Sequence, residues 1–157
     1  MKEVIFSLLD KSANTFSIVA LLKELHLKDP KFSLYEPELS DIKGPQDRWV
    51  CHAAESMGLS VEVLDGRVIS IAVVPHFDTP LDFFAIGGQI QTLILMKSRV
   101  EVQEYLGIPL YSTELFDHYL LNKDVVLGVL SWPLLNDEIS NFCFGSKRVF
   151  SSPERIP

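Results

Sequence analysis

The fold is decided by residues 60–97, which read SVEVLDGRVISIAVVPHFDTPLDFFAIGGQIQTLILMK. Two turn dipeptides, Asp65-Gly66 and Gly87-Gly88, each stand between strongly apolar segments. Such dipeptides supply the positive φ angles that match the twist of a β-hairpin. The stretch therefore predicts a four-stranded, mainly antiparallel β-meander.

Helical periodicity flanks this predicted meander on both sides. Ser98 and Glu101 stand three residues apart before an apolar run, which is the signature of a capping box at a helix start. Pro45 and Gly58 suit the first turn and the left-handed end of another helix. Apolar stripes recur at the spacing of a buried helical face. The sequence predicts four helices that pack on the meander, at about 14–27, 46–58, 99–106 and 113–122.

Chain length and composition place these elements in one α+β domain. The chain has 157 residues, of which 47% are hydrophobic, and this suffices for a single core. Val125 to Trp132 is rich in β-branched residues, so we expect a further buried strand at about 125–132. The end of the chain is polar and contains proline, which suits a periphery. We expect a single domain over 1–145 and a C-terminal tail over 146–157.

The formal net charge of -7 restricts the class of partner. Nonspecific nucleic-acid binding rests on clustered Lys and Arg, so nucleic acid is disfavoured and a basic protein is favoured. Cys51 and Cys143 lie far apart and neither has metal-ligand spacing, which suits reduced thiols in a cytosol. No apolar run approaches the roughly 18 residues that cross a bilayer. The sequence predicts a soluble cytoplasmic protein with no cofactor, no metal site and no membrane association.

One catalytic alternative is a thiol hydrolase built on Cys51. A cysteine nucleophile needs a base to raise its thiolate fraction and a carboxylate to orient that base. His76 and Asp78, which share one expected loop, would complete this triad. The competing interpretation places Cys51 in the apolar stripe of the helix over 46–58, where a small thiol packs and stays protonated.

A second catalytic alternative rests on Asp82 and Lys97. A carboxylate near the start of one strand, a hairpin and a lysine closing the next strand resemble the core of restriction-endonuclease-like nucleases. This resemblance implies metal-dependent phosphodiester cleavage, with Asp82 holding a divalent cation and Lys97 positioning water. The family's second carboxylate would stand at Leu95, so Glu62 or Glu104 would have to replace it. A degenerate nuclease fold without activity is part of this alternative.

The helix expected over 113–122 carries acidic and aromatic residues together. At helical spacing such residues make an amphipathic surface that suits partner binding better than metal or cofactor chemistry. The candidate partner-binding residues are Glu114, Phe116, Asp117 and Tyr119.

The sequence favours a non-catalytic protein-protein interaction module over an enzyme. Catalysis needs several converging polar groups, whereas binding can use a sheet edge and a few aromatic anchors. We expect an acidic accessory or inhibitory partner protein, such as an immunity protein, that masks a basic site on another protein. A homo-oligomer is a further alternative, formed through the pair Phe83 and Phe84 or the edge carrying Phe142 and Phe144.

Overall fold

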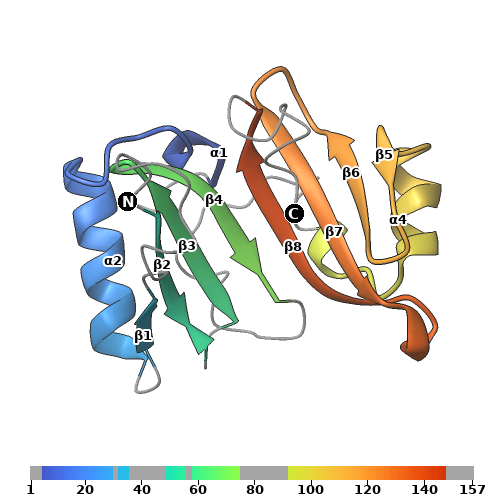
Figure 1. The fold of residues 1–157 in the computed structure, drawn as a ribbon, viewed down its shortest axis with the longest axis horizontal. Helices are drawn as coiled ribbons and strands as arrows, with labels where there is room; N and C mark the ends of the chain where they lie inside the picture. The colour runs from blue at the N-terminus through green and yellow to red at the C-terminus, as the bar shows by residue number, and fades with distance from the viewer. Residues whose placement is uncertain (1–4, 30–31, 36–48, 56–57, 75–91, 148–157) are drawn as a thin grey trace.

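The structure is a computed structural model, and Figure 1 shows its ribbon. It describes residues 5–29, 32–35, 49–55, 58–74 and 92–147. The named helices within these ranges are α1 (Ile5–Leu8), α2 (Phe16–Lys28), α4 (Arg99–Leu106) and the 3-10 helix η4 (Pro133–Leu135), and residues 92–94 are also helical.

The described strands form one eight-stranded sheet in which every neighbouring pair is antiparallel. Their order across the sheet is β1-β2-β3-β4-β8-β7-β6-β5. The strands are β1 (Phe32–Tyr35), β2 (Trp49–Ala54), β3 (Leu59–Leu64), β4 (Arg67–Val73), β5 (Tyr111–Ser112), β6 (Phe116–Leu120), β7 (Val125–Trp132) and β8 (Glu138–Ser146).

The sheet consists of two four-stranded halves that meet at β4 and β8. In the first half α2 precedes β1–β4, and in the second half, residues 99–147, α4 precedes β5–β8. The last strands of the two halves pair with each other, with Ile71 opposite Phe144 and Val73 opposite Phe142. Figure 1 shows α2 beside the β1–β4 half and α4 beside the β5–β6 end of the sheet.

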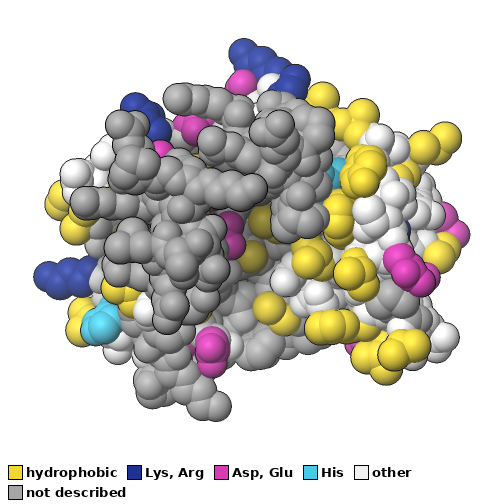
Figure 2. All heavy atoms as spheres, viewed as in Figure 1, with side chains coloured by type: hydrophobic (Ala, Val, Ile, Leu, Met, Phe, Trp, Pro, Cys, Tyr) yellow, Lys and Arg dark blue, Asp and Glu magenta, His cyan; other side chains and the backbone are white. Residues whose placement is uncertain are grey.

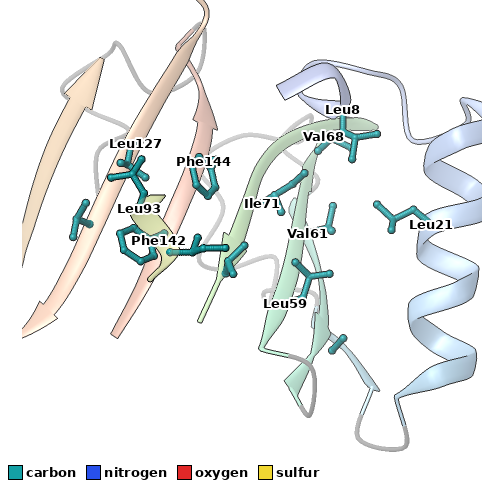
Figure 3. Packing of buried hydrophobic residues seen from close by; sticks show 14 of the residues in the cluster. Leu8, Leu21, Leu59, Val61, Val68, Ile71, Leu93, Leu127, Phe142 and Phe144 are labelled. Atoms are coloured by element: carbon teal, nitrogen blue, oxygen red, sulfur yellow. The ribbon is translucent and has the colours of Figure 1, made fainter. Parts of the chain in front are cut away.

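A single hydrophobic cluster extends across both halves (Figure 3). Leu59, Val61 and Val63 alternate with half-buried residues along β3, so one face of that strand is directed into the core. Phe142 and Phe144 of β8 are fully buried in the same cluster. The helical segments cover this face with Leu8, Ile18, Leu21, Leu25, Leu93 and Val102.

Several predicted local features are confirmed. Asp65 and Gly66 have φ angles of 50° and 75° and form the turn between β3 and β4. The helix expected at 14–27 is α2, and the strand expected at 125–132 is β7.

The predicted capping box at the start of α4 is also present. The Glu101 amide donates to Ser98 Oγ at 3.3 Å. The Glu101 carboxylate accepts from the Lys97 amide at 2.6 Å, one residue earlier than in the usual reciprocal arrangement.

The predicted fold class is wrong, because the described chain is mostly β and has no four-stranded meander over 60–97 packed by four helices. The helix expected at 46–58 is instead β2, and the helix expected at 113–122 is replaced by β6. Short apolar runs fit both the helical and the extended period, so partners distant in sequence decide between them. For β2 those partners are β1 and β3, and for β6 they are β5 and β7.

The expected meander ends early. Its first hairpin is β3–β4, but residues 92–94 are helical, so no strand leads into Lys97. The Gly87-Gly88 turn lies outside the described residues. The proposed division into a domain over 1–145 and a tail over 146–157 stays a prediction, although β8 includes Ser146, which is fully buried.

We predict that Phe142→Ala lowers the free energy of unfolding by about 3–5 kcal/mol, because it leaves a cavity where β8 packs in the core. Leu34→Ala on β1 is the matched control, since Leu34 is exposed, and it should cost well under 1 kcal/mol. Urea unfolding of both variants measures the difference. Equal losses would show that the core does not lie where this sheet places it.

Candidate functional site

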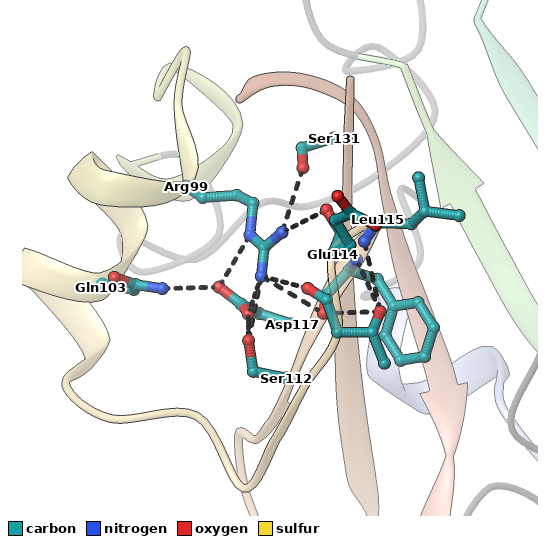
Figure 4. A network of polar contacts seen from close by, with 9 residues as sticks. Arg99, Gln103, Ser112, Glu114, Leu115, Asp117 and Ser131 are labelled. Carbon is teal, nitrogen blue, oxygen red and sulfur yellow. Dashed lines mark hydrogen bonds and ion pairs between the residues drawn. The ribbon is translucent and has the colours of Figure 1, made fainter. Parts of the chain in front are cut away.

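A buried ion pair joins α4 to the sheet in the second half (Figure 4). Arg99, in the first turn of α4, is 9% exposed, and Asp117 of β6 is fully buried. The Arg99 guanidinium donates to both carboxylate oxygens of Asp117, at 3.2 Å for Nε to Oδ2. Gln103 Nε2 donates to Oδ2 at 2.9 Å, and Ser112 Oγ donates to Oδ1 at 2.6 Å. The carboxylate is thus surrounded by hydrogen-bond donors.

The remaining donors of Arg99 hold the turn between β5 and β6. Its Nη1 donates to the Glu114 carbonyl at 2.9 Å, and its Nη2 donates to the Thr113 carbonyl at 2.8 Å. Nη1 also reaches Ser131 Oγ of β7 at 3.5 Å. A planar guanidinium can bind several acceptors in fixed directions, so one side chain fixes α4, the turn and β7 relative to one another.

The network also controls the ionisation of Asp117. Burial alone would raise the pKa of this carboxyl. The hydrogen bonds from Arg99, Ser112 and Gln103 and the charge of Arg99 outweigh burial and hold the pKa below its usual range. Asp117 is therefore a carboxylate at neutral pH, with its charge balanced inside the protein.

The four predicted partner-binding residues do not share one face. Glu114 is exposed in the β5–β6 turn, and Phe116 is half-buried. Asp117 and Tyr119 point into the core on the opposite side of β6, and burial raises the pKa of Tyr119 to about 12. Of these four residues, only Glu114 and Phe116 reach the surface. Partner binding through the whole set stays a prediction.

Phe116 belongs to an aromatic cluster on the side of the sheet away from the core. Its ring centroid lies 4.7 Å from that of His118 and 6.0 Å from that of Tyr111. Burial lowers the pKa of His118, and the nearby charge of Asp117 opposes this shift. His118 faces Gly128 across the strands, where an added Cβ would lie 3.6 Å from the imidazole Nε2. The ring is thus a neutral packing group at neutral pH.

Large apolar side chains are exposed over much of the second half. Figure 2 shows them gathered over the β5–β8 half of the molecule. An exposed apolar surface of this kind marks an interaction site more often than a scattered leucine does. The exposed apolar residues of this half are Val100, Tyr105, Ile108, Leu110, Tyr111, Leu115, Leu120, Trp132, Leu134 and Leu135.

The charged side chains of the second half are mostly acidic. Arg99 is buried and balanced by Asp117, so it adds no free positive charge to the surface. The exposed cations are Lys123 and Lys147. The exposed carboxylates that outnumber them are Glu101, Glu104, Glu114, Asp124 and Glu138.

Cys51 lies on β2 and is half-buried. Burial, followed by the charge of Glu62, raises its pKa to about 11. Burial likewise raises the pKa of Cys143 to about 12. A thiol with these pKa values carries very little thiolate at neutral pH, which suits packing better than nucleophilic attack. His76 and Asp78, the other members of the predicted triad, lie outside the described residues.

Of the residues in the nuclease alternative, the described chain includes Lys97, Glu62 and Glu104. Lys97 is exposed in the connection before α4, and Asp82 lies outside the described ranges. Glu62 is on β3, where its carboxylate accepts from Ser70 Oγ at 2.7 Å, and Glu104 is exposed on α4. Metal-dependent cleavage through Asp82 and Lys97 therefore stays an untested prediction.

Among the described residues, no group of three or more His, Cys, Asp or Glu side chains is arranged to hold a metal ion. No described helix combines the length and apolar character that crossing a bilayer requires. Comparison with family models, with curated proteins and with solved structures finds no match for this chain.

Sequence reasoning missed the exposed apolar residues Trp132, Leu134 and Leu135. The run Trp132-Pro133-Leu134-Leu135 ends directly in Asn136, a turn residue. Consecutive apolar residues beside a turn are unusual on a surface that serves only solubility, and this signal was present in the sequence. Arg99 has no comparable signal, because its partners come from segments that only the fold brings near.

We predict that Asp117→Ala costs about 3–5 kcal/mol of stability at neutral pH, because it leaves the buried Arg99 guanidinium without its counter-charge. The double variant Arg99→Met/Asp117→Leu removes both charges and should cost less than the two single changes together. Urea unfolding of the double variant and of each single variant measures this coupling. Strictly additive losses would show that the pair does not act as a unit.

The pair between Arg99 and Asp117 also predicts how the stability of the protein changes with pH. The pKa of Asp117 is lower in the folded chain than in the unfolded chain, so its contribution is present above the ordinary carboxyl pKa of about 4 and is lost as pH falls through the folded value. Wild type should therefore lose more stability on acidification than the double variant does.

We predict slow alkylation of Cys51 in the folded protein. In a Cys143→Ala background, a pKa of about 11 should make its reaction with iodoacetamide at neutral pH about 100-fold slower than in the urea-unfolded chain. Mass spectrometry of timed samples gives both rates. Faster alkylation in the folded state would instead support the hydrolase alternative with His76 and Asp78.

Proposed function

We propose that this protein is a non-catalytic protein-protein interaction module. In this proposal it is an acidic accessory or inhibitory partner, similar in role to an immunity protein, that masks a basic site on another protein. The observation that carries the proposal is the surface of the second half, where large exposed apolar side chains stand among carboxylates.

The chemistry of this surface suits a protein partner. Buried aromatic and aliphatic anchors supply most of the affinity of protein interfaces. Surrounding charges add selectivity and accelerate association with a partner of opposite charge. The exposed carboxylates of the second half thus favour a basic surface on the partner.

The Arg99 network supports the same proposal. It fixes α4, the β5–β6 turn and β7 relative to one another before any partner arrives. A surface that is already ordered loses less conformational entropy on binding, so more of the contact energy appears as affinity.

Affinity capture from the native cell lysate, with nuclease treatment in parallel, tests this function. We expect a stoichiometric protein partner that survives nuclease. Purified partner should bind Glu114→Lys several-fold more weakly than wild type at low salt, with a smaller difference at high salt.

The matched control is Glu55→Lys, which reverses an exposed charge in the first half and should bind like wild type. Two results would contradict the proposal: the absence of a nuclease-resistant partner, or equal binding of Glu114→Lys and wild type at every salt concentration.

A further inference from the structure

Four exposed apolar residues lie near the end of the sheet where β7 leads into η4. We call Leu115, Trp132, Leu134 and Leu135 the Trp132 corner. Trp132 is 56% exposed and Leu134 is 98% exposed. The Ser131 amide donates to the Leu115 carbonyl at 2.9 Å, which places Leu115 of the β5–β6 turn beside the end of β7. In Figure 1, η4 lies at the lower right, and hydrophobic side chains occupy the same part of Figure 2.

The backbone around this corner is held by several hydrogen bonds. The Arg99 amide donates to the Asp137 carbonyl at 3.3 Å, and the Ile139 amide donates to the Lys97 carbonyl at 2.9 Å. Asn136 and Asp137 both adopt positive φ, which produces the sharp return from η4 into β8. The start of α4 and the start of β8 thus hold the backbone that carries the corner.

Strand alternation explains why Trp132 points outward, because Val129 and Ser131 are buried on one side of β7 and Trp132 lies on the other. The pairing of β7 with β8 shifts between Leu130 and Ser131. Beyond the shift, Ser131 is buried beside Arg99, and Trp132 lies opposite the exposed Glu138. The extra residue of the shift is Ser140 of β8, so β7 keeps its alternation across the bulge.

The charges around the corner are mainly negative. Glu114 precedes Leu115, Asp137 follows the η4 turn, and Glu138 lies opposite Trp132. The exposed cation Lys97 is joined to the start of β8 by the hydrogen bond from the Ile139 amide to its carbonyl.

We propose that the Trp132 corner is the anchor site for a basic segment of a partner protein. An aromatic or aliphatic side chain of that segment packs on Trp132 and Leu134, and its Lys or Arg residues face Glu114 and Glu138. This inference rests on the proposed function and specifies which part of the acidic half makes the decisive contact.

The surrounding charges favour this occupant over two others. An anionic membrane would be repelled by the carboxylates that flank Trp132. A second copy of this chain packed corner to corner would bring like charges together, which costs free energy in an interface. A basic protein segment satisfies both the apolar and the charged components of the site.

Selection from a random 12-residue peptide library displayed on phage tests the proposal directly. On immobilised wild type we expect enrichment of peptides that combine Lys or Arg with an aromatic residue or leucine. Synthetic peptides from this pool should bind Trp132→Ala and Leu134→Ala at least about tenfold more weakly than wild type. The matched control Leu34→Ala removes an exposed leucine from β1 and should bind like wild type.

Other outcomes would overturn the proposal. These are enrichment of peptides without cations, equal peptide binding by Trp132→Ala and wild type, or absence of enrichment. Trp132-dependent binding to vesicles of equimolar phosphatidylcholine and phosphatidylglycerol would also overturn the proposal. The same holds for a dimer in solution that Trp132→Ala dissociates. If a partner captured from lysate binds Trp132→Ala as tightly as wild type, this site is wrong while the proposed function stands.

Discussion

The arrangement of the second half depends on the buried pair between Arg99 and Asp117. An arginine buried without acceptors would cost several kcal/mol, and here its donors reach a carboxylate, three backbone carbonyls, Ser112 and Ser131. These acceptors come from β5, the β5–β6 turn, β6 and β7, so satisfying one guanidinium fixes the positions of all four. Arg99 and Asp117 neutralise each other inside the protein, so the exposed carboxylates dominate the surface charge of this half.

Two further constraints turn this packing into a binding surface. The pairing of β4 with β8 merges the halves into one sheet, so that β7 and β8 are held from both sides. The alternation of side chains along β7 then directs Ser131 toward Arg99 and Trp132 toward solvent. The end of β7 therefore completes the internal network on one side and exposes the apolar anchor on the other, which links stability of the second half to its proposed function.

Local features were predictable from the sequence where local chemistry decides them. The Asp65-Gly66 turn, the Ser98 cap and the continuous apolar run of β7 each follow from neighbouring residues. The helices expected over β2 and β6 were wrong, because strand partners distant in sequence determine those segments. At the candidate site, the acidic residues and Phe116 could be recognised in the sequence. The burial of Asp117 could not, because it depends on Arg99, eighteen residues earlier in the chain.

Amide hydrogen exchange of Asp117→Asn against wild type, under conditions where both are folded, tests the central claim most directly. The variant keeps the shape of the side chain and removes its charge. We predict faster exchange in α4, in the β5–β6 hairpin and at the amides of Arg99 and Ile139 beside the Trp132 corner, with β1–β4 unchanged. Exchange that is unaltered in the second half, or that rises equally in β1–β4, would contradict the claim that this pair organises the binding surface.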